Sequence, residues 1–302
     1  YFEDAYKKKE LPHFFKASGV LALAAVVGVC INISNLYHTY EYSKETMRGK
    51  SELKQEGAAA SQTSSGLDRD YITNWSYGIG ETLTLLVPNV KGGGSGSTMS
   101  QSEAAMAKAN PMYNGIYSQL PQYFGEQPWT AGPVYVGAFV MFLFVLGCFI
   151  VKGPLKWALL GATIFSILLS WGKNFMGLTD FFIDYVPMYN KFRAVSSILV
   201  IAEFTIPLLA IFALKEILSK PDMLKQEKNC RGVIAALVLT AGVALILAVA
   251  PGTFFSSFIT TQEMTALKQA LPAEHLAPFV ANLTEMREAI IASDAWELLS
   301  TT

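Results

Sequence analysis

Apolar runs of about 20 residues alternate along the chain with polar segments of very different length. Runs of that length with few charges are typical of membrane-spanning helices, because backbone polar groups in lipid must be paired within the segment. The third run is the weakest, since it is short and contains Lys156, whose long side chain can reach the membrane interface. The pattern predicts five spans, which cover residues 14–34, 132–151, 154–171, 195–214 and 232–250.

The distribution of lysine and arginine gives the five spans one consistent orientation. The N-terminal tail, the turn 152–156 and the segment 215–231 are basic, so the positive-inside rule places all three in the cytoplasm. The polar segments between them should then face outward. We therefore predict four parts: a cytoplasmic tail with the first span (1–36), a long, partly helical outer loop (37–131), four further spans with a second outer loop at 172–194 (132–250), and an outer tail (251–302).

The outer tail is predicted to form two amphipathic helices separated by Pro272. In the second helix, Leu276, Phe279, Val280 and Leu283 recur at helical spacing. We expect this apolar face to pack on the membrane surface.

Composition agrees with an all-α membrane protein. Only 16% of the 302 residues are charged, against about 25% in soluble domains. The net charge of -1 predicts neither a nucleic-acid binder nor a basic protein of the membrane surface. The three cysteines have no CxxC spacing and the three histidines are far apart, so neither a disulfide framework nor a zinc site is indicated.

The first cluster that could perform chemistry is the segment 74–82 in the long outer loop. Glu81 lies beside Trp75 and Tyr77, separated from them by two glycines. Aromatic rings can cover the apolar face of a sugar while a carboxylate accepts from its hydroxyls. The same residues also suit a helix start, with Glu81 in the first turn, where the helix dipole favours an acid. The two interpretations are compatible.

The second cluster, 123–130, lies just before the second predicted span. An aromatic belt at the membrane interface would explain Trp129 and its neighbours without any function. It does not explain Glu126 and Gln127 at that depth, so these two residues are candidates for a site.

The third cluster precedes the fourth predicted span and contains Tyr189, Asn190, Lys191 and Arg193. Two cations at the outer face run against the topological bias, and a phosphate-bearing headgroup would account for them, with Arg193 as a bidentate clamp. Interfacial anchoring is the alternative. Arg48, after the first span, could also reach an anionic ligand.

Glu203 lies within the fourth predicted span, one turn before Pro207. A charge at the centre of a bilayer costs about 2.5–3.5 kcal/mol even on lenient scales, so this carboxyl should face a cavity or a partner. A neutral, hydrogen-bonded core carboxyl is the favoured interpretation, and a proton or ion path is the alternative.

Taken together, four stretches resemble the YfhO family of bacterial polytopic membrane proteins. They are YSKETMRG (42–49), WSYGIGET (75–82), YFGEQPWTAGP (123–133) and YNKFR (189–193). The family is similar to GT-C-type glycosyltransferases, which are integral membrane enzymes that transfer a sugar from a polyprenyl-phosphate donor to an acceptor on the outer face. The resemblance implies an internal part of a longer protein in a bacterial plasma membrane.

The resemblance also implies roles for the three clusters. Transfer would be inverting, with or without a divalent metal, and the usual acidic base of the first outer loop would precede residue 1. In this chain Glu81 or Glu126 would act as base or orient the sugar, while Lys191 and Arg193 would stabilise the leaving phosphate. The partners implied are the bilayer, the lipid-linked sugar donor and a cell-envelope glycan or lipid acceptor, with no nucleic acid.

Two other functions fit the same sequence. A transporter or flippase for a lipid-linked or small anionic substrate is suggested by Glu203 and the Pro207 kink, although transporters often show paired broken helices and only one break is evident. A structural membrane scaffold would tolerate alanine at every candidate residue.

Overall fold

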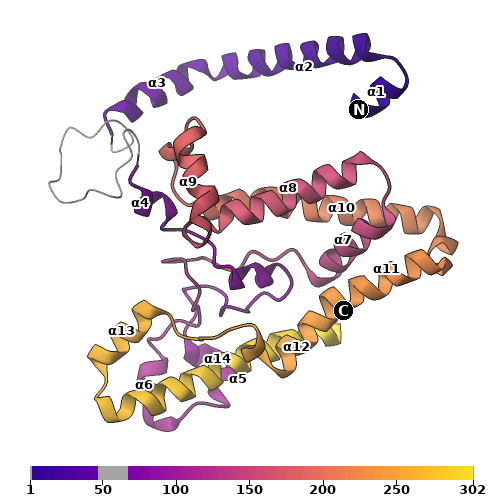
Figure 1. Cartoon of the computed structure of the whole chain (residues 1–302). Coiled ribbons are helices and arrows are strands. Elements are labelled where there is room, and N and C mark those ends of the chain that lie inside the picture. Colours follow the sequence, from indigo (N-terminus) through magenta and orange to yellow (C-terminus); the bar gives the residue numbers. More distant parts are fainter. Residues whose placement is uncertain (1, 47–66, 302) are drawn as a thin grey trace. The chain divides into compact units, whose positions relative to one another are not determined.

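The computed structural model describes residues 2–46 and 67–301, and these residues form helices joined by turns and loops (Figure 1). Extended pairing within the described ranges is limited to an isolated bridge between Thr98 and Pro121. The all-helical prediction is therefore confirmed for this part of the chain. The chain divides into two units, Tyr1–Arg69 and Asp70–Thr302.

The first unit contains one long apolar helix. α1 (Phe2–Lys7) is followed by α2 (Leu11–Ile31) and α3 (Ile33–Lys44), which meet at Asn32. α2 has 21 residues, enough to cross a hydrocarbon layer of roughly 30 Å, and none of its side chains is buried. It corresponds to the predicted span 14–34.

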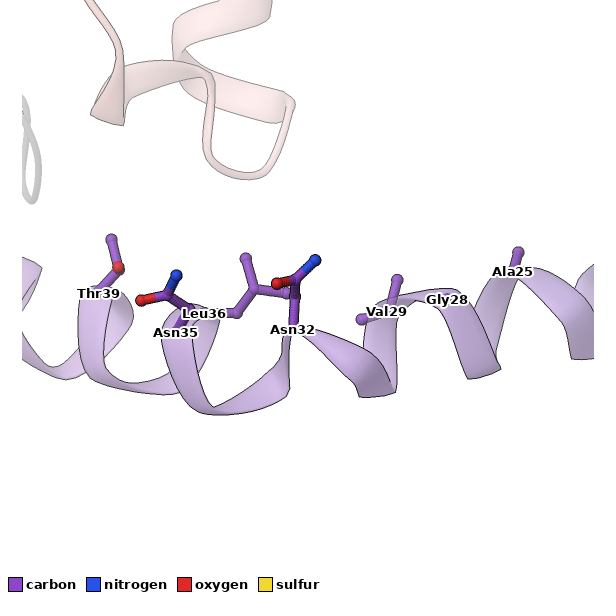
Figure 2. Close-up of a pocket in the computed structure, with 7 residues that line it drawn as sticks. All are labelled: Ala25, Gly28, Val29, Asn32, Asn35, Leu36 and Thr39. Carbon is purple, nitrogen blue, oxygen red and sulfur yellow. The ribbon is translucent and has the colours of Figure 1, made fainter.

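A shallow hollow of about 470 Å³ lies along α2 and α3. Figure 2 shows the side chains that line it. All of its lining residues, from Ala25 to Thr39, belong to this one helical rod, so the hollow is a helix surface with small side chains.

The second unit contains the other apolar helices. They are α7 (Ala138–Ile150), α8 (Pro154–Ser170), α10 (Val200–Ser219), extended at its start by the 3-10 turn η6 (Val195–Leu199), and the pair α11 (Glu227–Leu237) and α12 (Val243–Val249), joined by a π-helical turn, η8 (Val238–Gly242). Apolar helices thus occur where all five spans were predicted.

Three helices of the described residues are long and apolar enough to cross a membrane: Leu11–Ile31, Val195–Ser219 and Glu227–Val249. α8 and the following segment Gly172–Tyr185 are long and apolar enough for a fourth span only if they are taken as one span, and the chain bends by 108° between them. The predicted second span is shortened, because α7 begins only after Gly137, whose φ of 96° is a left-handed conformation. The structure therefore supports a membrane protein, and the count of five spans stays a prediction.

α7, α8 and α10 pack around one core. Gly147 of α7 lets the helix approach Leu209 and Ala213 of α10 closely. The Thr163 hydroxyl of α8 pairs with the Thr205 hydroxyl of α10 at 2.7 Å, which satisfies two buried polar groups.

The outer tail forms α13 (Thr261–Ala270) and α14 (Ala273–Thr301), which meet at Pro272 as expected. The apolar face of α14 packs on the outer loop, since Phe279 and Leu283 are fully buried in a cluster with Tyr113 and Tyr117. The Tyr117 hydroxyl also bonds Asn282 Oδ1 at 2.5 Å. The expectation that this face lies on the membrane is therefore wrong, because the loop already covers it.

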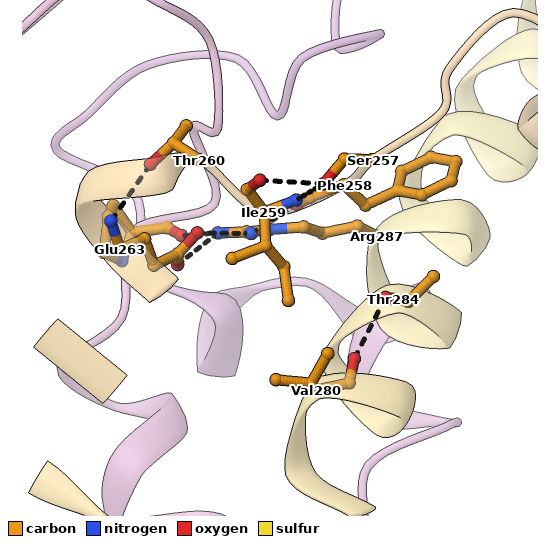
Figure 3. A network of polar contacts seen from close by, with 9 residues as sticks. Ser257, Phe258, Ile259, Thr260, Glu263, Val280, Thr284 and Arg287 are labelled. Carbon is orange, nitrogen blue, oxygen red and sulfur yellow. Dashed lines mark hydrogen bonds and ion pairs between the residues drawn. The ribbon is translucent and has the colours of Figure 1, made fainter. Parts of the chain in front are cut away.

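A buried ion pair joins the two helices of the tail (Figure 3). Arg287 of α14 is 0% exposed, and its two terminal nitrogens each lie 2.7 Å from an oxygen of Glu263 of α13. The guanidinium also donates to the carbonyls of Phe258, at 2.6 Å, and of Pro121, at 3.4 Å. It lies 4.8 Å from the centroid of the Phe124 ring. One side chain thus connects α13, the segment before it and the outer loop.

We predict that Arg287→Met destabilises the second unit by about 3–5 kcal/mol, because it leaves the Glu263 carboxylate unpaired in a largely buried position. Chemical unfolding of the detergent-solubilised chain measures this difference. Arg231→Met is the matched control, since Arg231 also pairs with a glutamate, Glu227, but both side chains are exposed. That change should cost about 1 kcal/mol or less, and equal effects of the two substitutions would contradict the prediction.

Candidate functional site

The second unit contains a polar pocket of about 640 Å³, a size typical of small-ligand sites. Its walls come from the outer loop, from the turn after α8 and from the segment that leads into α13. The charged residues among its lining are Glu81, Lys91, Glu126 and Lys173. Segments that are far apart in the sequence therefore meet at one hollow that carries both signs of charge.

Glu81 lies at the inner wall of the pocket and is 2% exposed. Its Oε2 accepts from the Gly78 backbone N–H at 2.5 Å, and its Oε1 accepts from the Tyr123 hydroxyl at 2.5 Å. Burial, and secondly the charge of Glu81, raise the pKa of Tyr123 above its usual value, which keeps this hydroxyl a donor. Both oxygens of Glu81 are thus engaged in holding the loop.

The local fold around Glu81 depends on glycines. Glu81 is in the first turn of the 3-10 helix η1 (Gly80–Leu85), so the helix-start interpretation is confirmed. A Cβ on Gly125 would overlap the Glu81 Oε1 and the Tyr123 hydroxyl, and one on Gly78 would lie 3.0 Å from Glu81 Oε2. Only residues without a side chain let the loop close around this carboxylate.

Glu126 occupies the rim of the same pocket and is exposed. Its backbone carbonyl accepts from Lys173 Nζ at 3.2 Å, which ties the rim to the turn η4 (Gly172–Phe175) after α8. The next residue, Gln127, bonds through its side chain to the Ser196 hydroxyl at 3.3 Å. Unlike Glu81, Glu126 is exposed, although its Oε1 lies only 3.3 Å from the position that a Cβ on Gly78 would take.

Lys91 is half-buried between two aromatic rings. Its Nζ lies 4.4 Å from the centroid of the Phe255 ring and 4.8 Å from that of Phe124. Burial lowers the pKa of Lys91 below its usual value, Glu81 and Glu126 oppose that shift, and Arg287 adds to it. Lys91 has no local sequence signal for this environment, because the rings around it come from two distant segments.

A second group of candidate residues forms an aromatic cluster beside the pocket. The Arg193 guanidinium lies 5.2 Å from the Trp75 ring centroid and donates to the Tyr71 hydroxyl at 2.8 Å. The indole N–H of Trp75 donates to the Trp129 carbonyl at 3.2 Å, while the Trp129 ring is 58% exposed. The first and third sequence clusters thus meet, but Arg193 packs on aromatic rings and is not among the residues that line the pocket.

The remaining candidates lie away from the pocket lining. Tyr77 is 2% exposed, its hydroxyl pairs with that of Thr84, and its ring belongs to the core that α7, α8 and α10 form. Tyr189, Asn190 and Lys191 form the short turn η5 (Tyr189–Lys191) and are half-buried. Arg48 lies outside the described residues.

Glu203 is exposed in the first turn of α10. The expectation of a buried core carboxyl is therefore wrong for this chain, because the apolar side of α10 faces α7 and α8 and Glu203 does not.

No group of three or more His, Cys, Asp or Glu side chains that could hold a metal occurs within residues 2–46 and 67–301. Comparisons with protein-family models, with curated proteins and with solved structures find no match to this chain.

We predict that Gly125→Ala distorts the pocket, because its methyl group must displace Glu81 or Tyr123 from their hydrogen bond. Overpacking of this kind costs about 1–3 kcal/mol, measurable by chemical unfolding in detergent. Gly96→Ala is the control, since a Cβ there meets no atom within 4 Å. A Gly125→Ala chain as stable as the Gly96→Ala chain would show that the loop does not close tightly around Glu81.

Proposed function

We propose that the chain belongs to an integral membrane glycosyltransferase-like protein that transfers a sugar from a polyprenyl-phosphate donor to a cell-envelope acceptor. The observation that carries the proposal is the pocket in which an exposed carboxylate, Glu126, lies with two lysines, Lys91 and Lys173. The same unit contains helices of membrane-spanning length. The resemblance of four sequence stretches to the YfhO family, and through it to GT-C-type enzymes, supports the same function.

The pocket residues suit the two charges that develop in this reaction. Transfer breaks the bond between sugar C1 and the phosphate oxygen, and forms a bond from C1 to an acceptor hydroxyl oxygen. A carboxylate must take the hydroxyl proton, and cations must stabilise the phosphate that leaves. Glu126 is placed to act as the base because its carboxylate is exposed at the pocket rim. Glu81 acts as a positioning residue, since both of its oxygens hold the loop.

The sugar would be held at the edge of the pocket nearest the aromatic cluster. Trp129 is an exposed ring close along the chain to Glu126 and Gln127, and indole faces stack well on the apolar face of a sugar. The proposed setting is the outer face of a bacterial plasma membrane, with the start of the chain in the cytoplasm.

We predict that Glu126→Gln lowers the rate of transfer by about 10²–10⁴-fold, the usual contribution of a general base. The measurement is the transfer of a radiolabelled sugar from synthetic short-chain prenyl-phosphate sugars to envelope material, using the chain in proteoliposomes. Glu285→Gln is the control, since Glu285 is exposed on α14 and outside the pocket lining. Equal transfer by the two variants would contradict the assignment of Glu126 as base.

A transporter or flippase is the second candidate, and breaks in the apolar helices favour it. α8 is followed by a bend of 108°, Pro207 lies inside α10, and the span Glu227–Val249 contains a π-helical turn. Interrupted helices of this kind often build transport sites.

The same proteoliposomes separate the two functions. A transporter moves the labelled prenyl-phosphate sugar to the opposite leaflet without cleaving it, and its flux should fall in Glu203→Gln. Cleavage with no net movement supports the transferase, whereas flux that Glu203→Gln leaves unchanged counts against a transport path at that residue.

A further inference from the structure

The two lysines of the pocket come from different segments of the chain. Lys91 comes from the outer loop after η1, and Lys173 from the turn after α8. The ion pairs found among the described residues of the second unit include neither Lys91 nor Lys173. Two cations that converge on one hollow from separate segments indicate a ligand with negative charge.

The surroundings of Lys91 hold its ammonium group in place without satisfying its donors. The Phe124 and Phe255 rings attract the charge through their faces, but they offer no lone pair to accept a hydrogen bond. An ammonium has three N–H donors, and the Lys91 Nζ is not sealed from the pocket that it lines. A ligand oxygen in the pocket can accept from these donors in place of water.

Lys173 is anchored at its backbone and free at most of its tip. Its backbone N–H donates to the Ser76 hydroxyl at 2.8 Å, and the preceding Gly172 has a φ of 43°, which fixes the direction of the turn. One Nζ donor reaches the Glu126 carbonyl. The other two remain for a ligand, because Lys173 is exposed on the pocket side.

The start of α13 adds positive potential to the pocket. α13 begins at the pocket, where Thr260 caps the helix by accepting from the Glu263 N–H at 3.2 Å, and Thr261 and Gln262 are lining residues. The first turn of a helix carries partial positive charge. Of the two acids in the pocket, Glu81 has both oxygens occupied, so Glu126 at the rim is the acid that a ligand would meet.

We propose that Lys91 and Lys173 form the anion subsite of this pocket and bind the phosphate group of the substrate. This assignment deepens the proposed function and rests on it for the identity of the substrate, but not for the presence of the subsite. It replaces Lys191 and Arg193, which the sequence favoured, because Arg193 packs on Tyr71 and Trp75.

The test measures binding of three probes to the full chain in a neutral detergent by calorimetry. Inorganic phosphate carries the charge alone, geranyl phosphate carries charge and a prenyl chain, and geraniol carries the chain alone. We expect Lys91→Gln and Lys173→Gln each to weaken both phosphates about tenfold, in line with the loss of one charge-assisted hydrogen bond. Lys268→Gln, on the exposed last turn of α13, should leave all affinities unchanged.

The probes also identify the source of the phosphate. If geranyl phosphate binds more tightly than inorganic phosphate, and the lysine variants weaken the binding of both, the phosphate is carried by a lipid. If the two bind equally, the phosphate group belongs to a soluble ligand. Either result supports the subsite. The subsite is overturned if both lysine variants keep the phosphate affinity of the original chain. It is also overturned if Arg193→Ala loses phosphate binding while the lysine variants retain it.

A substitute variant and the sugar-transfer assay separate the subsite from the transferase activity. If Lys91→Gln fails to fold, the exposed Lys173 carries the test, and Lys91→Arg should restore binding. Loss of phosphate binding in the lysine variants, together with no sugar transfer by any form, would leave the subsite standing and overturn the transferase. Normal transfer with unchanged phosphate affinity in those variants would overturn the subsite alone.

Discussion

The buried pair between Arg287 and Glu263 is the interaction on which the candidate site depends. A guanidinium with no exposed surface needs a counter-charge and acceptors, and here the partners of its two terminal nitrogens come from α13, from the segment before it and from the outer loop, while Nε has no partner. Because α13 and that segment also form one wall of the pocket, the same pair that stabilises the tail determines where the wall stands. The stability of the tail and the position of the pocket wall therefore both depend on the pairing of Arg287 with Glu263.

The two carboxylates of the pocket illustrate how burial separates roles within one residue type. Glu81 is surrounded by donors from Gly78 and Tyr123 and is held rigidly, whereas Glu126 is exposed to solvent a short distance away. A carboxylate whose oxygens are both occupied organises a loop, and an exposed one can accept a proton. The pocket thus has a fixed inner wall and a chemically available rim.

The sequence was sufficient for the helices and insufficient for the site. Apolar runs locate α2, α10 and α11–α12 because helix length and hydropathy are local properties. The late start of α7 follows from the backbone conformation of Gly137, which hydropathy does not register. Glu81 was found as a candidate, but its partner Tyr123 lies 42 residues on, and the rings around Lys91 are equally non-local. Arg287 carries no sequence signal of burial, so its role emerged only from the packing.

The Phe124 ring has an additional consequence. It neighbours the Lys91 ammonium and the Arg287 guanidinium, each at 4.8 Å from its centroid. An aliphatic side chain of similar volume would fill the space but would lack the negative ring face that attracts both cations. Position 124 is therefore constrained by both cations at once. Natural variants should carry another aromatic residue there unless Lys91 or Arg287 changes with it.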